Sequence, residues 1–169
     1  LHRPMWDLGE TKPGQGVRVP AGVSDERQSI WISYVPVASV REDLANLALW
    51  EQHHFVAGPE FPFEEVKIGG GPPPLRIPEG WLVLHHGVTG VIDSAFSQQQ
   101  KVNYAAGALI LDADDPSRVI ARTPEPLLAP ETDAERSGIV PHVVFPTAIE
   151  EIDVRHFGCY GLAPSEIRL

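Results

Sequence analysis

Two positively charged residues, Arg3 and Lys67, lie beside glycines or prolines that determine the local backbone conformation. Arg3 directly precedes Pro4, and the residue before a proline is held in an extended conformation. An arginine on extended backbone is suited to anion binding, because its guanidinium carries several N–H donors. Lys67 is followed by a glycine triplet and a proline triplet, which allow close approach of a ligand and exclude a helix. Arg3 is therefore a candidate for binding an anion, and Lys67 is a candidate for a site built on a rigid loop.

A pair of histidines ends the apolar stretch that follows this loop. After a turn at Gly80, residues 81–84 (WLVL) predict a strand that places His85 and His86 at its far end. Side chains alternate across a strand, so the two imidazoles point to opposite faces. We therefore expect Lys67 and one of the two histidines to face a common site, and we do not expect the pair to chelate a metal.

The rest of the sequence predicts short strands joined by turns. Strands are expected at residues 29–34, 103–111, 119–122, 138–145, 153–161 and 166–169, and loops at 7–28, 55–63 and 123–136. Pro141 places its strand at an edge or a bulge. A helical stripe is found only in residues 40–54, where Leu44, Leu47 and Trp50 recur at roughly helical spacing. The fold class is therefore mostly β, a sandwich, barrel or propeller, and no clean internal repeat chooses among these.

Composition narrows the class of protein. The chain has 169 residues, 43% of them hydrophobic, which is enough for one domain with a core. A net charge of −10 argues against a nucleic-acid surface and requires any anion site to be built locally from few cations. The one cysteine, Cys159, excludes an internal disulfide framework, and no window approaches the ~18 apolar residues of a membrane span. We expect a soluble, cytoplasmic protein.

Several common site motifs are missing from the sequence. No G-K-[ST] follows the glycine triplet, and there is no G-x-S-x-G elbow of a serine hydrolase. The remaining histidines have no spacing that defines a metal site. Residues 112–116 (DADDP) lack the glycine and distal glutamate of a calcium loop, so they predict a capped turn.

The ordered motifs resemble those of glycoside hydrolase family 130, the β-mannoside phosphorylases and related mannosidases, over nearly the whole chain. The family order is LHRP, an IWIS-type strand, K-I-G-x-G-P-P-P, G-W-L-L-x-x-H-G, Y-x-x-G-A-x-L-L-D-x-x-D-P, P-E-x-x-x-E, G-x-V-P-x-V-V-F-P and Y-G. The matching segments here are residues 1–4, 30–33, 67–74, 80–87, 104–116, 130–135, 138–146 and 160–161.

This resemblance implies a fold and a place within it. The family fold is a five-bladed β-propeller, of which residues 1–169 would form roughly the last three blades as one domain. The general-acid aspartate of the family lies upstream of the LHRP segment and has no counterpart in this sequence. We therefore expect the chain to be inactive by itself and to associate, either as a homo-oligomer or with a separate N-terminal half.

The resemblance also assigns roles to residues. It implies that Arg3, Lys67, His86 and Tyr104 bind inorganic phosphate, and that His85 and Gly70 contact the sugar. The implied reaction is inverting phosphorolysis of a β-mannoside, which gives mannose 1-phosphate. Phosphate is then a co-substrate, and no cofactor or metal is expected.

Two alternatives remain open. Glu64 or Glu65 would supply the base of a β-mannosidase that uses water, since residues 63–65 (FEE) stand where the family commonly has Trp-Asp-Ser. The chain would otherwise be a catalytically silent propeller fragment that binds sugar. Pro164 replaces an aspartate that helps the family hold the sugar, and neither the linkage nor the acceptor follows from the sequence.

Overall fold

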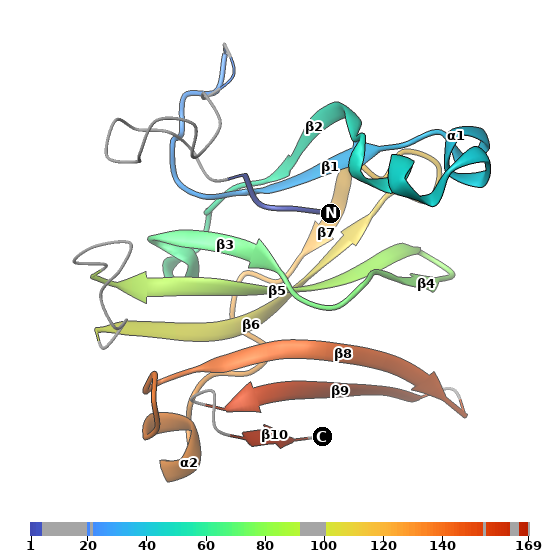
Figure 1. The fold of residues 1–169 in the computed structure, drawn as a ribbon. Coiled ribbons are helices and arrows are strands. Elements are labelled where there is room, and N and C mark those ends of the chain that lie inside the picture. The colour runs from blue at the N-terminus through green and yellow to red at the C-terminus, as the bar shows by residue number, and fades with distance from the viewer. Residues whose placement is uncertain (5–19, 21, 92–100, 154, 163–165, 169) are drawn as a thin grey trace.

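The computed structural model describes residues 1–4, 20, 22–91, 101–153, 155–162 and 166–168. These residues form three antiparallel sheets with few and short helices (Figure 1), so the predicted mostly-β class is confirmed. The strands are β1 (Ile30–Tyr34), β2 (Glu51–Ala57), β3 (Lys67–Gly70), β4 (Leu75–Ile77), β5 (Gly80–Gly90), β6 (Val102–Leu111), β7 (Val119–Arg122), β8 (Val144–Ile152), β9 (Arg155–Leu162) and β10 (Glu166–Arg168). The helices are α1 (Val37–Glu42), α2 (Asp133–Arg136) and the 3-10 turns η1 (Leu44–Ala48) and η2 (Pro62–Glu64). Among the described residues, no helix has the length and apolar content that a membrane crossing needs.

The sheets follow one another along the chain. β1 pairs with β2, the central sheet has the order β3-β5-β6-β7 with β4 on β5, and the last sheet has the order β10-β9-β8. In Figure 1 the central sheet lies between the other two, and contacts join β1 to β3 on one side and β5 and β6 to β8 on the other. The central sheet is therefore covered on both faces.

Register in the central sheet decides which side chains share a face. Lys67 on β3 and Tyr104 on β6 are both paired with Val88 on β5, so the three form one row across the sheet. His86 stands two residues before Val88 and therefore points to the same face. Val88 and Tyr104 belong to the apolar cluster on that face. Lys67, His86 and Tyr104 are thus brought together by strand pairing.

The opposite face of the same sheet packs against β1 and β2. Its core contains Ile30, Val56, Ile68, Val83 and Leu109, all of them buried. His85 points to this side, because side chains alternate along β5. The predicted separation of the two histidines is confirmed by these positions.

Residues 40–54 contain the short helical turn that the sequence suggests, but they also begin a strand that it does not predict. The helical turns are α1 and η1, and β2 begins at Glu51 and runs into the expected loop at 55–63. The apolar stripe of this segment stays largely exposed, with Leu44 and Leu49 at 71% and 61%. A longer helix therefore has no surface to bury, whereas β2 satisfies the backbone of β1 and buries Val56.

Residues 138–143 do not form the first part of the strand that the sequence predicts at 138–145. β8 starts at Val144 and continues to Ile152. Gly138 has a φ of 150° and His142 a φ of 59°, and the second value is left-handed and departs from regular strand geometry. The backbone N–H of Tyr104 donates to the carbonyl of His142 at 2.9 Å, so this irregular segment pairs with β6 instead.

Two segments of the chain form a short repeat, and the structure shows that both copies make the same hydrogen bonds. Residues 59–64 (PEFPFE) and 130–135 (PETDAE) share the pattern P-E-x-x-x-E. Glu64 Oε2 accepts from the backbone N–H groups of Glu60 and Phe61 at 2.9 and 3.1 Å. Glu135 Oε2 accepts from the equivalent groups of Glu131 and Thr132 at 2.7 and 2.8 Å. Each glutamate thus closes the short turn that leads into a sheet.

The second oxygen of each glutamate reaches the sheet that follows. Glu64 Oε1 accepts from His85 Nε2 on β5 at 2.8 Å, and Glu135 Oε1 accepts from the Tyr160 hydroxyl on β9 at 2.9 Å. Both glutamates are almost fully buried. The repeated segment therefore anchors two successive sheets in the same way.

Candidate functional site

A cleft of about 540 Å³ opens beside the central sheet, on the face that carries His86. Its lining comes from the N-terminal segment, β3 and the Gly-Pro loop that follows it, the strands β5 and β6, and the start of β8. The lining residues are Leu1, His2, Arg3, Gly69, Gly70, Gly71, Pro72, Pro73, Pro74, His86, Tyr104 and Phe145. Arg3, His86, Tyr104 and Gly70, four of the residues predicted from the sequence, therefore share one cleft.

Arg3 reaches the cleft because the N-terminal segment adds to the first sheet. His2 and Trp31 exchange two backbone hydrogen bonds of 2.8 Å, which form an antiparallel bridge. This bridge holds Arg3 extended next to β3, as the following proline predicts. Burial lowers the pKa of Arg3, an effect that the neighbouring Tyr104 opposes. The guanidinium still remains charged at neutral pH.

Gly69 makes room for two functional side chains. A Cβ atom at this position would lie 2.7 Å from His86 Nε2 and 3.2 Å from Arg3 Nη1. The imidazole and the guanidinium therefore both lie directly over the backbone of β3. The sequence signal was the glycine triplet itself, although it did not show which side chains use the space.

His86 is neutral at physiological pH. It is 4% exposed and stacks on Phe145, with ring centres 4.5 Å apart. Burial, and then the charges of Arg3, His85 and Lys67, lower the pKa of His86 to about 3. Its Nδ1 atom is buried without a hydrogen-bond partner among the described residues. The imidazole therefore keeps one N–H and one lone pair, and at least one of its nitrogens is available to a ligand.

Lys67 and Tyr104 lie behind this pair. The Lys67 ammonium stands 5.6 Å from the centre of the Tyr104 ring, and the lysine is 6% exposed without lining the cleft itself. Burial and the charge of Arg3 lower the pKa of Lys67 to about 8. Burial raises the pKa of Tyr104, although Arg3 opposes it, so its hydroxyl stays protonated. The described lining of the cleft contains no carboxylate, which leaves the two cations without a negative partner there.

His85 does not reach the cleft. Its side chain is fully buried on the opposite face, between Glu64 and the space left by Gly107, where a Cβ atom would lie 2.6 Å from the imidazole. The contact with sugar that the resemblance implied for His85 is therefore at odds with its position. Gly70, by contrast, lines the cleft and has open space where a side chain would point.

The two glutamates considered as a catalytic base lie elsewhere. Glu64 is 0% exposed, and Arg122 Nη2 donates to its Oε2 at 2.6 Å. Burial would raise the pKa of Glu64, but hydrogen bonds from His85, Arg122 and two backbone N–H groups lower it to about 2. Glu65 is exposed and does not line the cleft. Neither carboxylate therefore lines the cleft. Glu64 instead anchors β5 through its hydrogen bond with His85.

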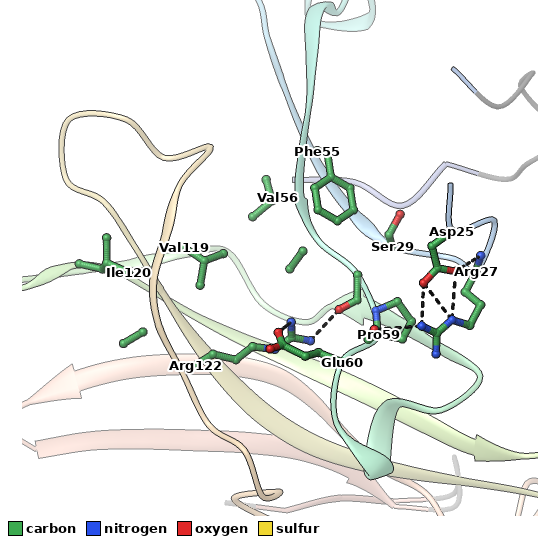
Figure 2. A pocket seen from close by; sticks show the side chains of 13 residues that line it. Asp25, Arg27, Ser29, Phe55, Val56, Pro59, Glu60, Val119, Ile120 and Arg122 are labelled. Atoms are coloured by element: carbon green, nitrogen blue, oxygen red, sulfur yellow. Dashed lines mark hydrogen bonds and ion pairs between the residues drawn. The ribbon is translucent and has the colours of Figure 1, made fainter. Parts of the chain in front are cut away.

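A second cavity, of about 570 Å³, lies between the outer strands β2 and β7 (Figure 2). Its two arginines already have carboxylate partners. Arg27 pairs with Asp25 at 2.6 Å, and Arg122 pairs with Glu60 at 3.0 Å. With both cations neutralised, this cavity is less suited to an anion than the cleft at Arg3 and His86.

Phe145 and Gly69 shape the cleft, although the sequence-based assignment gives them no role. Phe145 stacks on His86, and Gly69 admits both His86 and Arg3. Both lie within segments that match family motifs, but the motifs do not show which side chains these two residues contact.

The predicted turn at residues 112–116 is confirmed, because Asp112 Oδ1 accepts from the backbone N–H groups of Asp114 and Asp115.

The geometry defines a β-sheet protein with a cleft that contains Arg3 and His86, has aromatic side chains at its border and has no carboxylate in its described lining. Residues 42–169 match the family model Glyco_hydro_130, described as beta-1,4-mannooligosaccharide phosphorylase. The chain therefore belongs to glycoside hydrolase family 130. The matched range contains Lys67, His86 and Tyr104, whereas Arg3 precedes it.

Individual relatives agree with this family. A beta-1,2-mannobiose phosphorylase from Thermoanaerobacter sp. is 39% identical over 105 residues, 62% of this chain and 32% of the relative. A beta-1,4-mannooligosaccharide phosphorylase from Ruminococcus albus is 38% identical over 103 residues, 61% of this chain and 29% of the relative. The solved structure of a beta-1,2-mannobiose phosphorylase from Listeria innocua, in complex with beta-1,2-mannobiose, has a TM-score of 0.66 and 29% identity, covering 88% of this chain and 37% of that one. The chain thus spans about a third of the length of the proteins that it matches.

Proposed function

We propose that this chain is the phosphate-binding part of an inverting β-mannoside phosphorylase. The observation that carries the proposal is the convergence of Arg3 and His86 over Gly69, with Lys67 behind them and no carboxylate in the described lining. A site with two cations and a neutral donor favours an oxyanion over a neutral nucleophile. The names of the relatives support the same reaction class.

The proposed fold is a five-bladed propeller to which the three sheets contribute successive blades. The repeated P-E-x-x-x-E anchor supports this, because it joins each of two short turns to the second strand of the next sheet in the same way. The similarity to the Listeria innocua structure over 88% of the chain supports it as well. In such a fold the cleft faces the central axis, where the other blades complete it.

Each residue has a distinct part in phosphate binding. Arg3 offers two parallel N–H donors to two phosphate oxygens, and Lys67 adds a positive charge from behind. His86 donates one hydrogen bond while it remains neutral, and the hydroxyl of Tyr104 donates another. The exposed backbone of Gly70 allows the phosphate or the sugar to approach β3 closely.

The reaction then follows from the position of the anion. A phosphate oxygen held by Arg3 and His86 attacks C1 of the mannosyl residue, and the bond from C1 to the glycosidic oxygen breaks. The leaving oxygen takes a proton from a carboxylic acid, which the family resemblance places upstream of Arg3. Attack from the face opposite the leaving group inverts C1, so a β-mannoside gives α-mannose 1-phosphate and a shortened acceptor. The proteins named above act on β-1,2 or β-1,4 linkages, and the proposal covers the β-mannoside class without choosing between the two.

Hydrolysis is the second candidate. It requires a carboxylate that activates water on the face opposite the leaving group. Glu64 is buried on the other side of the central sheet and Glu65 does not line the cleft, so phosphorolysis is favoured.

The test is product analysis on this chain together with the half that carries the general acid, because residues 1–169 alone are expected to be inactive. With β-linked mannobiose and inorganic phosphate, we expect mannose 1-phosphate by ³¹P NMR, and no free mannose in phosphate-free buffer. Arg3→Ala removes charge-assisted hydrogen bonds and should weaken phosphate binding by about 10- to 100-fold in calorimetry. Release of free mannose at the same rate with and without phosphate would establish the hydrolase instead.

A further inference from the structure

An aromatic group stands at the mouth of the cleft, outside the cationic site. His2 lines the cleft next to Arg3, and its ring contacts the rings of Trp50 and His53. The ring centres of His2 and Trp50 are 5.3 Å apart, and those of His2 and His53 are 5.9 Å apart. His2 therefore belongs both to the cleft and to this outer aromatic group.

The indole of Trp50 is held in a fixed orientation although it is 52% exposed. Its Nε1–H donates to the carbonyl of Leu47 at 2.5 Å. The η1 turn that carries Leu47 is itself fixed, because the Asp43 side chain accepts from the backbone N–H of Ala45 at 2.9 Å. An exposed ring with a fixed orientation loses little conformational entropy when a ligand covers it.

The two imidazoles beside the indole are fixed by a hydrogen-bonded chain. His2 Nε2 lies 2.6 Å from Ser33 Oγ, and Ser33 Oγ lies 2.6 Å from His53 Nδ1. This chain uses one nitrogen of each ring. It orients both rings at the edge of the cleft, beside a flat apolar surface.

The combination of these groups indicates a class of ligand. A pyranose ring has an apolar C–H face that packs on an indole and hydroxyl groups at its rim that exchange hydrogen bonds with imidazoles. A phosphate ion has no apolar face to place on Trp50. We propose that Trp50, His2 and His53 form a subsite for a sugar ring of the oligosaccharide, outward from the phosphate position. This inference rests on the proposed function, because it assumes that the substrate in the cleft is an oligosaccharide.

A protein partner is the competing occupant. Leu44, Leu47 and Leu49 are exposed around Trp50, at 71%, 49% and 61%, and such a patch also fits a protein surface. The sugar is favoured because His2 makes the surface continuous with the cleft, and because the His2–Ser33–His53 chain places polar groups where an apolar protein surface would leave them unpaired.

The experiment is calorimetric titration of the purified protein with β-linked mannotriose and, separately, with inorganic phosphate. Trp50→Ala should weaken mannotriose binding about 3- to 10-fold and leave phosphate binding unchanged. Trp50→Phe should retain most of the mannotriose affinity. Leu49→Ala is the matched control, since it removes an exposed apolar side chain from the same patch and should change neither affinity.

Each outcome separates the subsite from the phosphate site. Unchanged mannotriose affinity in Trp50→Ala overturns the subsite, and so does a wild type that binds phosphate but not mannotriose. A lower molecular mass of both Trp50→Ala and Leu49→Ala in light scattering, with mannotriose binding intact, also overturns it and identifies a protein interface. If Arg3→Ala leaves phosphate affinity unchanged while Trp50→Ala loses mannotriose, the proposed phosphorolysis fails and the sugar subsite stands.

Discussion

His85 Nε2 donates to Glu64 Oε1 at 2.8 Å, and neither side chain is exposed. This bond ties η2 to β5 at the residue directly before His86. The imidazole that faces the cleft is thus positioned by the buried imidazole beside it, through the strand they share. Glu64 acts on the site by holding β5, without touching the ligand.

Removing the Glu64 carboxylate should be strongly destabilising. Glu64→Ala removes a buried carboxylate that accepts hydrogen bonds from Arg122, His85 and two backbone N–H groups. Loss of one partner from a buried ion pair costs about 3–5 kcal/mol. Urea unfolding should show this loss, while Glu65→Ala, an exposed neighbour, should stay within about 0.5 kcal/mol of wild type.

Acid should unfold the protein through its two anchor glutamates. Burial raises the pKa of Glu64 from the ordinary value of 4.5, but hydrogen bonds lower it to about 2. Backbone hydrogen bonds from Thr132 are the main cause that lowers the pKa of Glu135 to about 2. A carboxyl whose folded pKa is lowered contributes stability that is complete above 4.5 and is lost as pH falls toward 2. Melting temperature measured from pH 6 to pH 2 should fall steeply below pH 4.5, and Glu135→Gln should make that fall shallower.

Phosphate affinity should decline in alkali because of Lys67. Burial and the charge of Arg3 lower the pKa of Lys67 to about 8, and a bound anion would raise this pKa by favouring the ammonium. Between about pH 8 and pH 10 phosphate keeps its charge, so each pH unit should weaken binding by up to about tenfold through loss of one proton. Calorimetry over this range is the measurement. Lys67→Arg keeps its charge throughout and should remove the decline, and a decline of equal slope in that variant would argue against Lys67.

Gly69 and Gly70 make a matched pair for testing the geometry of the site. A Cβ atom at Gly69 meets His86 at 2.7 Å and Arg3 at 3.2 Å, whereas Gly70 has nothing within 4 Å. Gly69→Ala should displace the imidazole, weaken phosphate binding at least about tenfold and cost about 1–3 kcal/mol of stability. Gly70→Ala should leave both phosphate affinity and stability near wild type. Equal phosphate affinity in the two variants would mean that His86 does not bind the anion.

Local patterns in the sequence determined the mostly-β class of the fold and the positions of several of its strands. The four residues of β7 were predicted at the positions where they lie, and the alternation along β5 correctly separated His85 from His86. The stiff backbone before Pro4 and after Lys67 marked both cations of the site. These signals are local, because pleating and proline geometry act within a few residues.

Tertiary structure decided which distant residues meet. β2 forms where the sequence predicts no strand, because β1 needs a partner for its backbone groups. Lys67 and Tyr104 share a row only through their common partner Val88, and Arg3 joins them only because His2 bridges to Trp31. The role of Glu64 followed from the same pairing, since a carboxylate in a loop shows no sign of being buried until His85 and Arg122 surround it. Strand register is set by the packing of whole faces, and no single segment contains that information.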